Sequence, residues 1–192
     1  MSGASRRKIA GAGVPDRGDR LIVTVSGNTS GLKSEIIDVA GRALRSQGLV
    51  RGSLHVAVVG DTVMRRQHRR WLGEDSTTDV LTFDLRDVPK KGFVEGELLV
   101  CSALARRRAR ADRRDWKPEL LLYVVHGCLH LSGRDDCDES QAARMHRIED
   151  RILSSLGWGP VYSSAYSEVS PPRRRAASSK RAAMPRPRHR RT

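Results

Sequence analysis

The residues of this chain best suited to chemistry stand close together, in the stretch HGCLHLSGRDD at residues 126–136. His126 and His130 are four residues apart and therefore share one face of a helix. Gly133 can end that helix in a left-handed turn, and the turn can bring Asp136 back toward both imidazoles. Two imidazoles and one carboxylate are ligands that zinc accepts, and three protein ligands with an open fourth position are typical of a catalytic zinc site.

A metal ion in such a site could serve more than one reaction. Zinc lowers the pKa of a bound water and polarises a carbonyl or phosphoryl oxygen, so peptide and phosphodiester hydrolysis are both open. The spacing up to Asp136 matches the elongated zinc motif of metzincin peptidases. In His-Glu-x-x-His peptidases, however, the glutamate after the first histidine is the general base, and here Gly127 holds that position. We therefore expect no peptide cleavage by that route.

The cysteines offer one rival ligand, and the histidines and aspartates also have an explanation that needs no metal. Cys137 is close enough to be a rival ligand, whereas Cys128 lies about 200° around the helix from His126 and should face the core. The histidines could also be ordinary core groups, with the aspartates capping the next helix. Three cysteines without a repeated spacing form no disulfide framework and indicate a reducing compartment.

Composition and charge indicate a cytoplasmic protein that meets polyanions. The N-terminal residues include no apolar core segment, so no signal peptide is predicted. The longest apolar stretch, residues 120–131, is too short to cross a membrane. The net charge is +14, of which the nine Arg and Lys of residues 171–192 supply +9. Such a basic segment favours polyanions through counterion release, although like-charge blocks are often only solvated tails.

The periodicity predicts one α+β domain over residues 20–160, between segments 1–19 and 161–192 that we expect to be disordered. Strands are predicted at residues 21–25, 54–59, 80–85 and 97–101. Helices are predicted at residues 30–48, 61–72, 102–112, 118–131 and 138–157, with Ser30 and Asp61 as caps. Residues 118–131 are apolar nearly all round, so this helix should be buried and central. The expected fold is zincin-like: a small mixed four-stranded sheet on one side and helices on the other, around the metal-bearing helix.

The eleven residues of the opening motif closely resemble the signature HGxLHLxGyDH of the YbeY family, bacterial metal-dependent endoribonucleases of ribosomal RNA maturation. The fixed places are filled by His126, Gly127, Leu129, His130, Leu131, Gly133 and Asp135. Residues 78–83 (TDVLTF) and 96–100 (GELLV) are similar to two strand motifs of the same family. The resemblance runs from about Leu21 to Leu156 and includes neither tail.

The resemblance implies a single-strand-specific endoribonuclease that matures the 3′ end of 16S ribosomal RNA and acts in ribosome biogenesis. It makes His126 and His130 ligands of one zinc ion and gives Asp136 the place of the third ligand. It also implies a small-subunit ribosomal protein and an Era-like GTPase as partners.

Two positions depart from the family pattern. The family usually has a third histidine where this chain has Asp136, an anionic ligand that should lower the Lewis acidity of the ion and widen the range of metals. A family arginine held to be important for activity falls on Leu72, and His68 falls on an asparagine position. A phosphate clamp could instead come from nearby arginines: Arg66, Arg69 and Arg70. These departures leave room for a non-catalytic ribosomal-RNA-binding assembly factor with a structural metal.

Other candidate residues are acidic or basic. Glu97, Asp79 and Asp135 could orient a ligand imidazole or support the zinc-bound water, or play plain surface, capping or turn roles. A second basic face could contact phosphates, or be a solvated helix face: Arg106, Arg107 and Arg110. Aromatic residues make up only 4% of the chain, so recognition should depend on charge and RNA shape rather than on stacking.

Overall fold

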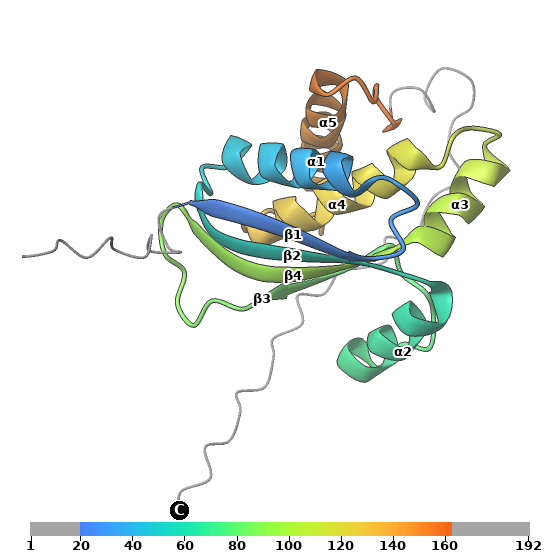
Figure 1. The fold of residues 1–192 in the computed structure, drawn as a ribbon, viewed down its shortest axis with the longest axis horizontal. Coiled ribbons are helices and arrows are strands. Elements are labelled where there is room, and N and C mark those ends of the chain that lie inside the picture. Colours follow the sequence, from blue (N-terminus) through green and yellow to red (C-terminus); the bar gives the residue numbers. More distant parts are fainter. Residues whose placement is uncertain (1–19, 163–192) are drawn as a thin grey trace, which may run out of the picture.

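The computed structural model describes residues 20–162, and both predicted terminal segments lie outside that range except Val161 and Tyr162 (Figure 1). Four strands are present: β1 (Leu21–Gly27), β2 (Arg51–Val59), β3 (Val80–Asp84) and β4 (Phe93–Cys101). Five helices accompany them: α1 (Lys33–Ser46), α2 (Asp61–Leu72), α3 (Ser102–Ala111), α4 (Lys117–Leu131) and α5 (Glu139–Ser155). The predicted α+β class is confirmed.

The sheet is mixed, with strand order β1-β2-β4-β3. Strands β1, β2 and β4 are parallel, and β3 pairs with β4 in the antiparallel sense. Along β2, alternate residues such as Leu54, Val56 and Val58 are buried in the main core because successive side chains of a strand point to opposite faces. The main core therefore lies between one face of the sheet and helices α1 and α4.

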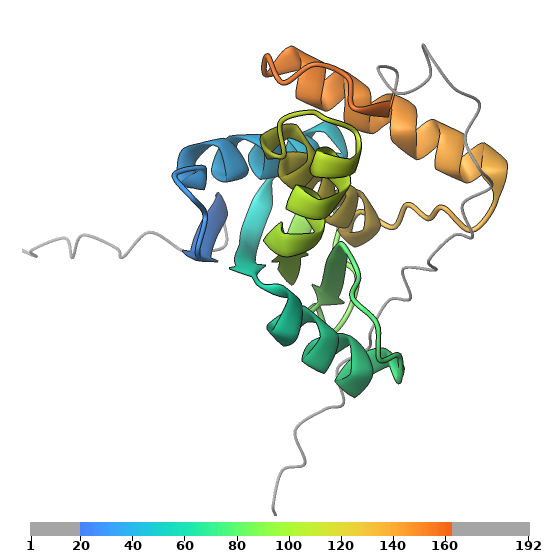
Figure 2. The ribbon, with the colours of Figure 1, turned by 90° about the vertical axis from the view of Figure 1, so that its right-hand side faces the viewer.

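Helix α2 corrects the expectation that all helices lie on one side of the sheet. Figures 1 and 2 show it on the face away from α1, α4 and α5. There Met64 packs with Phe83 and Cys101 in a second, smaller apolar cluster. The amphipathic pattern of α2 indicates that one of its faces is buried, but not which face of the sheet buries it.

Helix α4 is the buried central helix, as predicted, and it carries the metal motif. All its residues from Glu119 to Val125 and from Gly127 to Leu131 are buried. It ends in a Schellman turn: Gly133 has φ +90°, its N–H donates to the His130 carbonyl, and the Arg134 N–H donates to the Leu129 carbonyl. The predicted role of Gly133 as the helix terminator is confirmed.

The other helix ends differ from the prediction in detail. Leu32, not Ser30, is the N-cap of α1, because Ser30 lies in a turn where its N–H and hydroxyl both donate to the Asn28 side chain. Gly60, not Asp61, is the N-cap of α2. Asp138 does cap α5, since its carboxylate accepts the Gln141 N–H.

The domain continues two residues beyond the predicted boundary at 160. Val161 is buried in the main core, and one carboxylate oxygen of Asp150 accepts the N–H groups of Val161 and Tyr162 at 2.8 and 3.1 Å. Among the described residues, no helix is both long and apolar enough to cross a membrane.

Candidate metal centre

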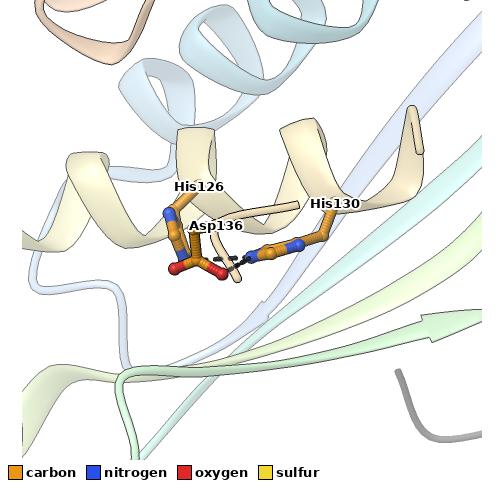
Figure 3. Close-up of side chains that lie close together, drawn as sticks. All are labelled: His126, His130 and Asp136. Atoms are coloured by element: carbon orange, nitrogen blue, oxygen red, sulfur yellow. Dashed lines mark hydrogen bonds and ion pairs between the residues drawn. The ribbon is translucent and has the colours of Figure 1, made fainter. Parts of the chain in front are cut away.

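Helix α4 and the turn after it bring together the three residues predicted as metal ligands (Figure 3). The Nε2 atoms of His126 and His130 lie 3.1 Å apart. The carboxylate of Asp136 faces both imidazoles, with Oδ2 3.8 Å from Nε2 of His126 and Oδ1 3.8 Å from Nε2 of His130. Within residues 20–162 this is the one group of three His, Cys, Asp or Glu that could hold a metal ion.

In each imidazole, the Nδ1 nitrogen, which faces away from Asp136, already has a hydrogen-bond acceptor. His126 Nδ1 lies 2.7 Å from a carboxylate oxygen of Glu149 on α5. His130 Nδ1 lies 3.1 Å from the carbonyl oxygen of Arg134, in the turn that leads to Asp136. A carbonyl and an ionised carboxylate only accept hydrogen bonds, so both Nδ1 atoms donate and both Nε2 atoms face Asp136.

This arrangement fits a divalent cation. Two unprotonated Nε2 atoms 3.1 Å apart place lone pair against lone pair, which is favourable only with a proton or a metal ion between them. Tetrahedral zinc with ligands at about 2.0–2.1 Å implies ligand atoms roughly 3.3 Å apart. The nitrogen–nitrogen distance of 3.1 Å is shorter than this value, and the two nitrogen–oxygen distances of 3.8 Å are longer. The His-His-Asp group could therefore hold a metal ion.

The titration of the two histidines reflects the same geometry in the metal-free protein. Burial lowers the pKa of His126, but the hydrogen bond and charge of Glu149, with Asp79 and Asp136, outweigh it and raise the pKa to about 9. The pKa of His130 is lowered, first by burial and then by the positive charge on His126. One proton, held on His126, thus occupies the position that a cation would take.

Gly127 has a packing role beside these histidines. A Cβ built on it would lie 2.8 Å from Leu98 Cδ2 and 3.0 Å from Val80 Cγ2, both side chains of the sheet. A glutamate at this position would therefore press on both side chains, which would have to shift to admit it. Glycine stands where the His-Glu-x-x-His peptidases have their general base, which argues against the metallopeptidase alternative.

Arg86, a residue that no sequence motif indicated, binds the C-terminal end of α4. Its buried guanidinium donates to both oxygens of Asp84, to the Phe93 carbonyl and to the carbonyl of Leu131, the last residue of α4. Because four acceptors from three segments converge on one planar group, the C-terminus of α4 is held against β3 and β4.

The acidic candidates from the sequence occupy different places. Glu97 does not reach the centre: its neighbours Gly96 and Leu98 face α4, so its own side chain points to the opposite face of the sheet. Asp135 shapes the turn by accepting the Asp136 N–H and the Cys137 thiol. Asp136 alone of these candidates joins the histidines.

Asp79 influences the centre through its charge. Its carboxylate accepts from Val80 N–H, from the Thr78 hydroxyl and from Arg108. Burial raises its pKa, but the charges of His126 and Arg108 and the two hydrogen bonds lower it to below its usual range. Asp79 therefore remains an anion near His126, and none of these three hydrogen bonds goes to an imidazole.

The cysteines behave as small side chains rather than as ligands. Cys128 is buried in the main core, as predicted, and burial raises the pKa of its thiol. Cys137 is exposed and donates to Asp135, and it does not belong to the group that could hold an ion.

The predicted arginine faces are exposed but largely engaged in surface contacts. On α2, Arg69 pairs with Asp75 and Arg70 lies over the Trp71 ring. On α3, Arg107 pairs with Asp61, and Arg106 stacks on Trp116 at 3.6 Å. Within the described part of the chain, no ion pair is formed by Arg66 and Arg110.

Leu72, at the family's arginine position, packs against the small apolar cluster around Phe83. His68, at the asparagine position, is buried, with Nδ1 2.8 Å from the Ser76 carbonyl oxygen. Leu72 therefore packs α2 against the sheet, His68 joins α2 to the loop before β3, and neither belongs to the His-His-Asp group.

The described domain is thus defined by a mixed four-stranded sheet, a buried central helix and a His-His-Asp group that could hold a metal ion. A family model described as "Endoribonuclease YbeY" matches residues 23–157. The chain belongs to the YbeY family.

Individual relatives agree with this assignment. The chain is 36% identical over 118 residues to an Endoribonuclease YbeY of Anaeromyxobacter sp., a match that covers 62% of each protein. It is 33% identical over 118 residues to that of Bordetella pertussis, covering 62% of this chain and 74% of the relative. A protein of Thermotoga maritima with a solution structure shares the fold, with a TM-score of 0.50 and 23% identity over 81% of this chain and 99% of that one.

Proposed function

We propose that this protein is a zinc-dependent, single-strand-specific endoribonuclease that acts in ribosomal RNA processing, at the 3′ end of 16S ribosomal RNA. The observation that carries the proposal is the pair of Nε2 atoms directed at the Asp136 carboxylate by separate Nδ1 acceptors. RNA as substrate follows from family membership and from relatives named endoribonucleases.

The residues of the centre would have two roles, metal binding and orientation of the ligands. His126, His130 and Asp136 would hold the ion, and Glu149 and the Arg134 carbonyl would keep both imidazoles oriented. Zinc would supply a lowered pKa for an attacking water and polarisation of the scissile phosphate. Surface arginines on α2 and α3 would contact the RNA backbone and contribute affinity through counterion release: Arg66, Arg69, Arg70, Arg106, Arg107 and Arg110.

The setting of the reaction is proposed from the family resemblance. A cytoplasmic enzyme would meet the RNA within the small ribosomal subunit, with a small-subunit ribosomal protein and an Era-like GTPase as partners. The net charge of +14 supports an encounter with ribosomal RNA.

Metal analysis followed by RNA cleavage tests the proposal. The wild type should contain one zinc ion per chain and cleave a single-stranded ribosomal RNA fragment, and His130→Ala should lose both properties. His55→Ala is a matched control, because His55 bonds Thr24 and Ser26 on the face of the sheet away from α4. Metal bound with no metal-dependent cleavage would exclude the enzyme.

A second function is favoured by one observation. Leu72 lies in an apolar cluster where the family commonly has an arginine, so a charge used for catalysis is missing at that place. A non-catalytic ribosomal-RNA-binding assembly factor would bind RNA equally well as wild type and as His130→Ala, and neither protein would cleave it.

A further inference from the structure

Glu149 stands out among the buried residues of α5. Its side chain is fully buried, and its inward neighbours on the helix, Met145, Ile152 and Leu153, are apolar residues of the main core. Oε1 accepts from His126 Nδ1 at 2.7 Å. Oε2 has no hydrogen-bond partner among the described residues.

Burial of a carboxylate with a single partner is unfavourable for folding. An anion removed from water needs several hydrogen bonds or a nearby positive charge to recover its hydration. A leucine or methionine at this position would continue the apolar face of α5 without that cost. Among the described residues the hydrogen bond of Glu149 goes to His126, which is positively charged in the metal-free protein, so the interaction that offsets the burial of Glu149 lies at the candidate metal centre.

We propose that Glu149 is a positioning residue of the metal centre, which holds His126 in the orientation and tautomer that present Nε2 to the ion. The inference rests on the proposed function only in requiring a metal at His126, His130 and Asp136. Glu149 accepts the Nδ1 proton, fixes the ring plane against α5 and increases the electron density that the imidazole can donate.

The two histidines are supported unequally. His130 donates to a neutral carbonyl of its own turn, four residues ahead, whereas His126 donates to a charged carboxylate of another helix. A charged acceptor makes the stronger hydrogen bond, so His126 is the stronger ligand of the pair.

Three variants test this role with zinc alone, without RNA, above pH 9, where protons no longer compete with zinc for Nε2 of His126. Glu149→Gln keeps the shape and one acceptor but removes the charge, and should weaken zinc affinity about tenfold. Glu149→Ala removes the acceptor and should weaken it toward 100-fold, the upper range for loss of an outer partner of a ligand histidine. Glu149→Met removes the acceptor but fills the core, and should match Glu149→Ala in affinity while unfolding at a higher temperature.

Three measurements separate positioning from simple packing. Competition with a chromophoric chelator gives the zinc affinity, and the melting temperature in excess EDTA gives the stability without metal. Proton NMR of the zinc-loaded protein should show the His126 Nδ1–H signal shifted downfield by its hydrogen bond to a carboxylate in the wild type, and this shift should be lost in Glu149→Met. Asp150→Asn is the matched control on α5, since Asp150 bonds the Val161 and Tyr162 backbone, and its zinc affinity should equal that of the wild type.

The outcomes distinguish this inference from the proposed function. Wild-type zinc affinity in Glu149→Met, with only the EDTA melting temperature changed, would show that Glu149 is structural and would overturn the inference while leaving the enzyme intact. Reduced affinity in the Glu149 variants would support it even if the protein cleaved no RNA.

Discussion

The metal centre and the arginine-rich helices α2 and α3 differ in how their functional atoms are held. In the centre, each ligand nitrogen is fixed by a second partner on the far side of its ring. On α2 and α3, the arginine side chains are mostly exposed and their contacts are surface pairs, as between Arg107 and Asp61. A fixed arrangement suits chemistry at one atom, whereas mobile surface charge suits attraction to a polyanion of many shapes.

Single changes in the centre should therefore have large effects, and single changes on the helices should have small ones. The largest effect is expected for Asp136→Ala. It removes a ligand, so zinc affinity should fall more than 100-fold, beyond the 10–100-fold typical for loss of an outer partner. Asp136→His should retain the ion and restore the family's ligand set. Chelator competition measures both, and an affinity for Asp136→Ala within threefold of wild type would remove Asp136 from the site.

The next effect is a pH dependence of metal binding. Below its pKa of about 9 in the metal-free protein, His126 carries a proton that the ion must displace, whereas the lowered pKa of His130 leaves that ring neutral near pH 7. Zinc affinity should therefore rise about tenfold per pH unit from pH 7 and level off above pH 9. Calorimetry in buffers of different ionisation enthalpy would count the proton released, and release of none at pH 7 would contradict the assignment.

A smaller effect is expected from Arg66 and Arg110, which form no ion pair within the described domain. The double variant Arg66→Ala, Arg110→Ala should lower the slope of log affinity against log salt by about 0.7 for each phosphate of single-stranded RNA that an arginine no longer neutralises. Zinc affinity and the cleavage rate at saturating RNA should not change. A filter-binding titration over several salt concentrations gives the slope, and an unchanged slope would place the RNA on another face.

The smallest effect concerns stability on the arginine side. Arg107→Ala breaks an ion pair whose side chains are 49% and 40% exposed, so the free energy of unfolding should change by less than about 1 kcal/mol. Urea unfolding in EDTA measures it. A reduction several times larger would show that this pair holds α3 in place and that Arg107 is fixed as firmly as the residues of the metal centre.

The grouping of His126, His130 and Asp136 could be predicted from the sequence because the three lie within eleven residues and depend on one helix and one turn. Glu149 and Arg86 could not be assigned, because their partners are distant in the chain and the contacts require packing of α5 and of β3 against α4. A signal for Glu149 did exist. It is an acid on the apolar stripe of α5 between Met145 and Ile152, where a buried charge requires a partner.

The strand boundaries show a similar limit. The sequence pattern predicts that β2 begins at Leu54, because a glycine such as Gly52 usually interrupts a strand. In the structure β2 begins at Arg51. In the sheet, Gly52 has φ +104°, and a Cβ on it would meet the Val94 carbonyl oxygen at 1.9 Å. The glycine permits a close approach of two strands, a reason that only the paired partner reveals.

The packing of Gly127 bears on how this fold could change its chemistry over evolution. A single substitution to glutamate would supply the missing base of a peptidase, yet Leu98 and Val80 occupy the space that the new side chain needs. Side chains on β4 and β3 would have to shift or become smaller to admit it, and smaller ones would cost core stability. The identity of one helix residue is thus coupled to the packing of two strands that lie distant from it in the sequence.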